Sequence, residues 1–533
     1  MASTTKLQGT IILLVLLGLM MTHRSGADRI LLVPMPLFNS HWMVEASIGQ
    51  ALVDKGHDVT VVVEEDIVEK RRAGRPDFMF ETFQDHGFGT RLREFQDDVL
   101  KLAESVSTYQ ELKQHTNASE WATKHCDHLL GKEGGGDSDL LRRLKTAQYS
   151  VVISDPLLRC GTIVAASIKV PHVANCADGG TFFDKMATGV PLPLAYVPSF
   201  ESQLTDQMTF LQRVENVLFF GLTNIARSWI YSYMYDDLVL KYISEEETIQ
   251  SVTSRTDLWL YQTDTVLGFP RPSMPNMVQV GGLTVRAGAP LSEDMEDFMQ
   301  SSGDDGVIIV SFGSMVQKMP TEKKEMFAAV FAQLRQKVVW RDVGEKPTGL
   351  GNNTKLMSWL PQNDLLAHLK TRAFVTHAGL NGVYEALYHG VPMACLPLFG
   401  EQPGNAARVV AKGLGVKLDF GTVTSDELYQ AVRDVLTNNS YRETAAHLSR
   451  LYRDQPQTAM ERAVWWIEHV IKHGGLPHLR ARAVDLPFYQ YYLLDVAACL
   501  LAVCSAVLGT VWCSCSLVCR KICCKAGGKL KSQ

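Results

Sequence analysis

The chain has 533 residues, of which 46% are hydrophobic, 20% charged and 9% aromatic. This composition supports folded cores and excludes a disordered protein, and the length suggests roughly two to four domains of about 100–200 residues. The 52 basic and 57 acidic residues give a net charge of −5, which argues against a nucleic-acid-binding protein. Two basic residues in 1–27 and five in 520–533, with no acid in either segment, leave −12 on residues 28–519.

The first 27 residues have the pattern of a cleavable secretory signal peptide. Lys6 precedes the apolar run Ile11–Met21, and small residues follow at Ser25-Gly26-Ala27. A first transmembrane helix is the weaker interpretation, because it needs about 20 apolar residues. We therefore expect the mature chain to begin near Asp28.

The other end predicts a membrane anchor. Val496–Cys519 contains no charged residue and is long enough to cross a bilayer, after a juxtamembrane segment 476–495. Lys and Arg are retained on the cytoplasmic side of a membrane, so the basic tail 520–533 predicts a cytoplasmic C-terminus. The sequence thus predicts a single-pass type I membrane protein with a luminal body. Lys529 and Lys531 resemble a dilysine retrieval signal of the endoplasmic reticulum.

The body has few cysteines and several sequons. Cys126, Cys160, Cys176 and Cys395 allow one luminal disulfide, whose pairing the sequence does not assign. Sequons for glycosylation stand at Asn117, Asn352 and Asn438.

The first half of the body reads as alternating strands and helices. A strand at 29–34, a helix at about 42–55 ending at Gly56, and a strand at 59–63 form a βαβ unit. Further strands are predicted at 149–154 and 170–174, with a helix at 161–168 between them and helical residues in 94–130. Residues 190–250, rich in Pro, aromatic residues and Met, fit an acceptor-facing lid, a membrane-facing surface or additional packed helices equally well.

A second α/β series follows a polar linker at 284–305. Strands are predicted at 306–314, 337–341, 373–376, 391–396 and 416–418. The predicted fold is therefore α/β, with two Rossmann-like doubly wound domains, 28–283 and 306–475, followed by the transmembrane helix. Ligands of such sheets bind at the carboxyl ends of the strands, so we expect a cleft between the two domains.

The stretch 359–402 contains the residues of a candidate nucleotide site. A buried strand runs into the turn His377-Ala378-Gly379, after which Asn381 and Gly382 open a helix at 383–390. Backbone N–H groups and the dipole at a helix start suit a diphosphate. Glu385, one turn further, is placed to accept from a ribose diol, and Trp359 to stack on a base.

These residues also carry a resemblance to a known family. Trp359, Gln362, His377, Gly379, Asn381, Glu385, Glu401 and Gln402 fall at positions 1, 4, 19, 21, 23, 27, 43 and 44 of one stretch. This spacing resembles the 44-residue nucleotide-sugar box of the UDP-glycosyltransferase family, which implies a GT-B fold. The resemblance implies that Trp359 stacks on uracil, Gln362 contacts the base or ribose and Glu385 holds the ribose. It further implies that Ser314, His377, Asn381 and Gly382 face the diphosphate, and that Glu401 and Gln402 bind sugar hydroxyls. Gly379 permits the close approach of a diphosphate to this turn.

The family's catalytic pair corresponds to His41, in the loop after the first strand, and Asp155, which ends a later strand. A neutral His accepts the proton of an acceptor hydroxyl, and the carboxylate fixes its tautomer. The expected reaction is direct displacement of UDP with inversion, and no cofactor or metal is expected. Pro34-Met35-Pro36 replaces the Gly-rich turn of a Rossmann dehydrogenase. An inactive UDP-sugar-binding membrane protein remains the main alternative.

The donor and acceptor stay open at this point. The family usually has Asp where Glu401 stands, some branches have Ser at 382, and Gly404 replaces a common acidic residue. Motifs outside the box resemble an animal branch that contains ceramide galactosyltransferase, and the glucuronosyltransferases share the box. Arg341 is a candidate partner for a glucuronate carboxylate or a phosphate. We expect a lipophilic acceptor, an endoplasmic reticulum location and either a monomer or a homo-oligomer.

Overall fold

The structure is a computed structural model that describes residues 27–85, 87–90, 94, 121–131, 136–176, 187–199, 202–316 and 319–527. The chain separates into two units, Met1–Arg480 and Ala481–Gln533. The predicted signal peptide, the sequon at Asn117, the Lys529 and Lys531 signal and much of the segment 94–130 lie outside the described residues.

The first half of unit 1 is built on a seven-stranded parallel sheet of order β3-β2-β1-β4-β5-β6-β7. Its order reverses between β1 and β4, as in a doubly wound fold. The strands are β1 Arg29–Val33, β2 Asp58–Glu64, β3 Met79–Phe83, β4 Val151–Ser154, β5 His172–Cys176, β6 Leu258–Tyr261 and β7 Met277–Gln279. The helices are α2 Asn39–Asp54, η1 Glu65–Ile67, α3 Val68–Gly74, α6 Asp139–Thr146, α7 Cys160–Ile168, α9 Phe210–Tyr242 and α10 Ile249–Ser254, and residues 121–130 are also helical.

The central strands are apolar on both faces because helices cover both sides of the sheet. Leu31 packs toward α7 in one core, whereas Ile30 and Leu32 pack toward α2 in the other. This burial accounts for the near-continuous aliphatic run that predicted β1. The predicted strands and the helix at 161–168 are confirmed, with ends that shift by a few residues.

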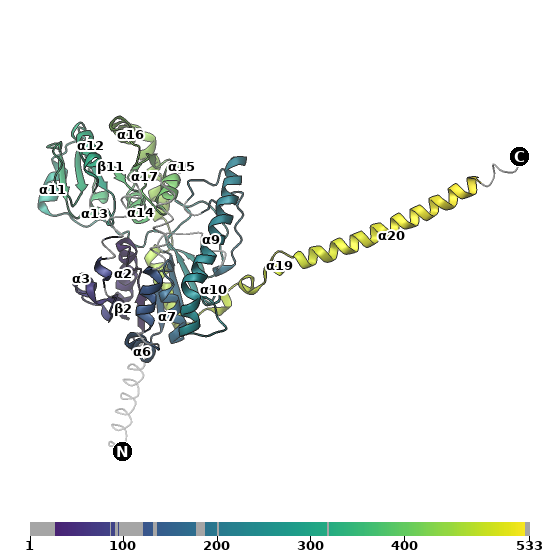
Figure 1. Cartoon of the computed structure of the whole chain (residues 1–533). Coiled ribbons are helices and arrows are strands. Elements are labelled where there is room, and N and C mark those ends of the chain that lie inside the picture. The colour runs from purple at the N-terminus through teal and green to yellow at the C-terminus, as the bar shows by residue number, and fades with distance from the viewer. Residues whose placement is uncertain are drawn as a thin grey trace, which may run out of the picture. The chain divides into compact units, whose positions relative to one another are not determined.

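The second half of unit 1 repeats the architecture with six parallel strands in the order β10-β9-β8-β11-β12-β13. The strands are β8 Val307–Ser311, β9 Lys337–Arg341, β10 Thr354–Met357, β11 Thr371–Thr376, β12 Met393–Cys395 and β13 Gly415–Lys417. The helices are α11 Glu293–Gln300, α12 Thr321–Ala332, α13 Gln362–Ala367, α14 Leu380–His389, α15 Gln402–Ala411, α16 Ser425–Thr437 and α17 Asn439–Arg453. Both halves place their sheets between helices, as Figure 1 shows.

Two helices depart from the predicted division into two domains and a linker. Helix α11 falls inside the predicted linker, where Met295 and Met299 are buried in the core of the second half. Helix α18, Ala459–His473, buries Ala463 and Ile467 in the core of the first half, against α2 and β6. The chain therefore returns to the first sheet after it has completed the second.

Residues 190–250, for which three interpretations were open, contain the 33-residue helix α9, the long teal helix of Figure 1. Thr209 caps its first turn, and Gln212 returns a bond to the Thr209 backbone in a capping box. Its last two turns pack in the first core through Tyr235, Leu238 and Val239.

A disulfide joins Cys126 to Cys160, whose Cα atoms are 5.2 Å apart. Cys176 and Cys395 are buried, and Cys395 is a free thiol. Before the end of unit 1 stands the short turn η2 Pro477–Leu479. Unit 2 contains η3 Arg482–Asp485, α19 Phe488–Tyr491 and α20 Leu494–Gly527, in which the 29 residues Leu494–Ile522 are long and apolar enough to cross a membrane.

Candidate active site

His41 and Asp155 come together at the carboxyl end of the first sheet. His41 lies in the first turn of α2, just after the loop that follows β1, and Asp155 directly follows β4. β1 and β4 are neighbouring strands, so both loops open at the same edge. The pairing of residues 114 positions apart is a direct consequence of the strand order.

The imidazole and the carboxylate form a short hydrogen bond, with Nδ1 of His41 2.5 Å from Oδ2 of Asp155. The Asp155 side chain is only 3% exposed, and its Oδ1 accepts from the backbone N–H of Leu157 at 2.8 Å. An acceptor-only carboxylate at this distance fixes the proton of a neutral ring on Nδ1 and leaves Nε2 as the basic nitrogen. The geometry is that of an oriented general base.

The turn between β11 and α14 approaches this pair from the second half. Nδ2 of Asn381 lies 3.4 Å from the backbone oxygen of Ser40, the residue before His41. The intrahelical bonds of α14 begin with Val383 N donating to Gly379 O at 3.1 Å, so the N–H groups of residues 380–382 precede them. A helix start that favours anions therefore lies next to the loop that carries His41.

The backbone of this turn is held in an unusual conformation. Ala378 has φ of +62°, which costs a non-glycine residue about 1–2 kcal/mol. Its carbonyl accepts from the buried Asn405 amide at 3.0 Å, and its N–H donates to Oγ1 of Thr376 at 3.3 Å. Asn405, one turn into α15, was missed by sequence reasoning because nothing local marks it as a partner of residue 378.

His377 fills the space between two glycines. An added Cβ would lie 2.4 Å from its Nε2 at Gly313 and 2.5 Å from it at Gly379, so both positions require glycine. Burial lowers the pKa of His377 to about 4, and the nearby Arg341 charge acts in the same direction, although a hydrogen bond with the Ser311 backbone partly opposes them. His377 is therefore neutral at physiological pH, and the single N–H of the neutral ring is engaged by the Ser311 backbone.

The predicted ribose residues are in direct contact. Nε2 of Gln362, at the start of α13, donates to Oε2 of Glu385 at 2.6 Å. Burial raises the pKa of Glu385 to about 7, and the Gln362 hydrogen bond only partly offsets it. Gly382 packs against both this pair and the core, since a Cβ there would lie 3.2 Å from Nε2 of Gln362 and 3.3 Å from the Phe374 ring. A side chain at position 382 would therefore require Gln362 or Phe374 to shift.

Trp359 lies after β10 with half of its side chain exposed, as a base-stacking platform requires. The guanidinium of Arg341 lies 5.5 Å from the centre of its ring, and Nη1 of Arg341 donates to the Gly313 backbone oxygen. Arg341 thus supports the turn after β8, in which Ser314 lies half-buried.

Glu401 and Gln402 lie at the start of α15. Oε1 of Gln402 accepts from the backbone N–H groups of Leu398 and Phe399 at 2.9 and 3.2 Å, so the side chain holds the loop before α15. Glu401 lines a pocket of about 620 Å³ together with Arg271, residues 196–199, Ser202 and Leu204 of the first half. This pocket lies at the boundary of the two halves.

A second pocket, of about 500 Å³, lies at the carboxyl ends of β1, β2, β3 and β4 and includes Asp155 in its wall. Its wall combines apolar residues such as Met35 and Leu158 with the charged Arg71 and Glu64. Glu45, one helical turn after His41, is fully buried, and burial together with the nearby Asp155 charge raises its pKa well above the usual range. Sequence reasoning missed this carboxyl because residue 45 looked like an ordinary helix position.

Comparison with known proteins shows the family. The family model described as "UDP-glucoronosyl and UDP-glucosyl transferase" matches residues 28–530. UDP-glucuronosyltransferase 2C1 of Oryctolagus cuniculus is 39% identical over 503 residues, which cover 93% of this chain and 99% of that protein. UDP-glucuronosyltransferase 1A1 of Mus musculus is 38% identical over 519 residues, which cover 95% and 94%.

Solved structures support the same fold. The calicheamicin glycosyltransferase CalG4 superposes with a TM-score of 0.56 and 18% identity, covering 84% of this chain and 99% of that one. Os79 from O. sativa in complex with UDP superposes with a TM-score of 0.53 and 16% identity, covering 83% and 100%. The two parallel sheets are thus the GT-B arrangement. The chain belongs to the family of UDP-glucuronosyl and UDP-glucosyl transferases and is a UDP-glycosyltransferase.

Proposed function

We propose that the chain moves a sugar from a UDP-sugar to a hydroxyl of a lipophilic acceptor, with inversion at the anomeric carbon. In this proposal residues 28–283 bind the acceptor and residues 306–475 bind the donor. The observation that carries it is the 2.5 Å bond between His41 and Asp155, together with the Asn381 contact that brings the α14 helix start to the same loop.

The proposed chemistry is a single displacement. Nε2 of His41 takes the proton of the acceptor hydroxyl while its oxygen bonds to the anomeric carbon. The bond from that carbon to the diphosphate oxygen breaks, and its electron pair leaves with UDP. Asp155 stabilises the imidazolium that forms, and the α14 helix start stabilises the growing diphosphate charge. Inversion then converts an α-linked donor into a β-linked product.

In this proposal each part of the UDP-sugar contacts its own group of residues in the second half. Exposed Trp359 stacks on uracil, and the Gln362–Glu385 pair takes the base and ribose, which their mutual contact supports. The residues assigned to the diphosphate are Ser314, His377, Gly379, Asn381 and Gly382. Glu401 and Gln402 are assigned to the sugar hydroxyls.

UDP-glucuronate is the donor that we propose first, since the similar proteins named above are UDP-glucuronosyltransferases. We further propose that no metal is needed, because the α14 helix start and the turn before it offer donors to the leaving group. The apolar helix at 494–522 supports a single-pass anchor, the basic tail supports a luminal body, and Lys529 and Lys531 support an endoplasmic reticulum membrane.

The test uses the full-length chain in cell membranes, with UDP release measured for UDP-glucuronate, UDP-galactose, UDP-glucose and UDP-N-acetylglucosamine. Each donor is paired with a simple phenol and with ceramide. We expect release to be fastest with UDP-glucuronate and the phenol, whereas preference for UDP-galactose and ceramide would replace the donor assignment. Retained UDP binding with no release for any pair would identify an inactive binding protein.

A further inference from the structure

The pocket of about 500 Å³ in the first half has a positively charged side chain in its wall, that of Arg71 in α3. Among the residues that the structure describes, the other ionisable side chains of this wall are those of Glu64, His125 and Asp155, and the remaining lining residues are apolar. A cavity of this size, with a mainly apolar wall and a few polar groups, is typical of a small-molecule site. The charges that the wall leaves unpaired then determine which ligand fits.

The two acids of this wall already have partners. Oδ2 of Asp155 lies 2.5 Å from Nδ1 of His41. Oε1 of Glu64 lies 3.5 Å from Nε2 of His125, whose Nδ1 lies 2.9 Å from Oδ2 of Asp85. Burial raises the pKa of Glu64, and the His125 ring opposes this rise more than any other group does. Each carboxyl of the wall therefore faces an imidazole.

The guanidinium of Arg71 differs, because within the described part of the chain no acid forms an ion pair with it. Its Nη1 donates to Oδ1 of Asn39 at 3.0 Å, and its Cζ lies 4.6 Å from the centre of the Trp42 ring. Burial lowers the pKa of Arg71 to about 10, and the Glu64 and Glu45 carboxyls only partly offset this. A guanidinium has more N–H donors than the one contact to Asn39 uses. A half-buried cation is thus left with donors for an anion.

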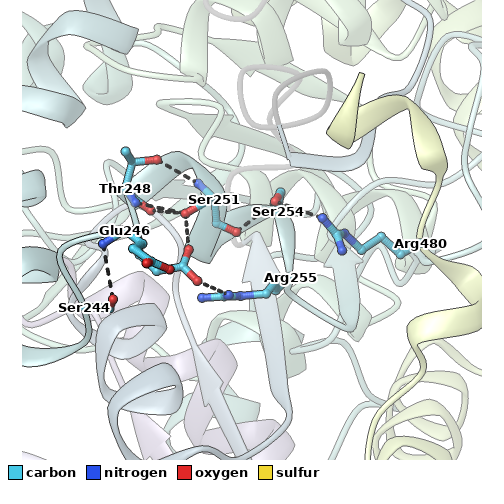
Figure 2. A network of polar contacts seen from close by, with 8 residues as sticks. Ser244, Glu246, Thr248, Ser251, Ser254, Arg255 and Arg480 are labelled. Carbon is cyan, nitrogen blue, oxygen red and sulfur yellow. Dashed lines mark hydrogen bonds and ion pairs between the residues drawn. The ribbon is translucent and has the colours of Figure 1, made fainter. Parts of the chain in front are cut away.

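Two other arginines of the first half show the more usual arrangement. Arg255 donates to Glu247 within the polar network that Figure 2 shows, and Nε of Arg143 donates to Oε2 of Glu81 at 2.8 Å. Both of these arginines are exposed, and water solvates an exposed charge even without its partner. Arg71 is less exposed than either, so an anion that pairs with it stabilises the complex more.

Arg71 also lies beside the helix turn that carries the proposed base. Asn39 and Trp42, which its guanidinium contacts, flank His41 at the start of α2. Residues 39, 41 and 42 lie within about one helical turn, so the guanidinium and the imidazole are on the order of 10 Å apart. The same pocket wall contains Asp155, the partner of His41. One small ligand can therefore reach from Arg71 to the base.

We propose that the acceptor of this chain carries a carboxylate, which the guanidinium of Arg71 binds while the hydroxyl of the acceptor lies at His41. This inference rests on the proposed function and adds the class of acceptor, a lipophilic hydroxy acid. The planar guanidinium matches both oxygens of a carboxylate, and charged hydrogen bonds of this kind are stronger than neutral ones. The apolar wall between Arg71 and Asp155 contacts the body of the acceptor.

The test compares two rigid ligands that differ in one charge, 6-hydroxy-2-naphthoate and 6-hydroxy-2-naphthamide. Their fluorescence gives a Kd for the full-length protein in detergent, independently of turnover. The Kd of the naphthoate should be at least about tenfold lower than that of the naphthamide. Arg71→Gln should bring the ratio of the two Kd values close to one. The matched control is Arg72→Gln, which removes the exposed neighbour that pairs with Glu69 and should keep the wild-type ratio.

Equal Kd values of the two ligands for the wild-type protein would overturn the proposal, and so would a naphthoate preference that survives Arg71→Gln. Sugar transfer to both ligands is measured in parallel with UDP-glucuronate. Transfer with equal Kd values contradicts this inference alone, whereas naphthoate preference without transfer to either ligand supports the carboxylate site and contradicts the proposed function. Product linked through the carboxylate, an ester that mild alkali cleaves, would place that group at His41 and overturn the proposal.

Discussion

The raised pKa of Glu385 predicts that donor affinity depends on pH if this carboxylate binds the ribose. Burial raises this pKa to about 7, so the carboxyl is largely neutral at pH 6 and ionised at pH 8. A ribose diol donates to the ionised form, because a carboxylate is a stronger acceptor than a carboxylic acid. Donor affinity should therefore fall as the pH falls through 7.

The magnitude follows from the ionised fraction. With a pKa of about 7, that fraction is about tenfold smaller at pH 6 than at pH 8, so the Kd for donor should rise about tenfold. Glu385→Gln should bind donor more weakly at pH 8 and show a flat profile. The matched control is Glu322→Gln, on the exposed first turn of α12.

Glu385→Gln should weaken donor binding at pH 8 but stabilise the folded protein. An acid whose pKa is raised by folding destabilises the folded state when ionised, and this cost is present above pH 7 and absent below pH 4.5. A shift from 4.5 to about 7 corresponds to about 3 kcal/mol, so Glu385→Gln should raise the Tm of the ligand-free protein at pH 8.

The assay is equilibrium binding of an intact UDP-sugar to the full-length protein in detergent. The intact donor avoids the terminal phosphate ionisation near pH 6 that free UDP would add. A wild-type Kd that stays constant between pH 6 and pH 8, with the Glu322→Gln control unchanged, would refute the assigned role of Glu385.

Two further substitutions, each with a matched control, test how the turns after β8 and β11 are built. Gly313 has φ of +78°, and an added Cβ would lie 2.4 Å from His377. Gly313→Ala should therefore lower the free energy of unfolding by at least about 2 kcal/mol and weaken UDP binding. The control is Gly56→Ala, at φ of +94° with no atom near the added Cβ, which should lower the free energy of unfolding by only about 1 kcal/mol and leave UDP binding unchanged. Equal shifts in Tm for Gly313→Ala and Gly56→Ala would contradict the role given to His377. Asn405→Ala should lose about 1–3 kcal/mol and also UDP affinity, since it releases the Ala378 carbonyl. Asn353→Ala, which removes an amide from the Phe331, Leu334 and Gln336 carbonyls, should lower the Tm alone, as thermal and binding titrations would show.

The sequence was most informative where local pattern and strand order coincide. Buried aliphatic runs predicted the parallel strands, and the glycines and polar residues after β11 predicted the turn that opens α14. His41 and Asp155 could be paired only through the family resemblance, because their approach depends on β1 and β4 being neighbours.

What escaped prediction depends on contacts between distant segments. Asn405 supports Ala378 from another helix, and Glu45 is fully buried near Asp155, which raises its pKa. Helix α18 is amphipathic like its neighbours, and no local signal reveals that its apolar face returns to the first sheet.

The central claim is that His41 acts on the acceptor while the second half binds UDP. Asn381 contacts the backbone oxygen of Ser40, so His41→Ala leaves the link between the halves in place. Turnover and UDP affinity of the full-length protein should therefore separate. The account predicts a kcat at least about 100-fold lower, with the Kd for UDP unchanged. A His41→Ala enzyme that keeps most of its kcat, or that loses UDP binding together with activity, would contradict it.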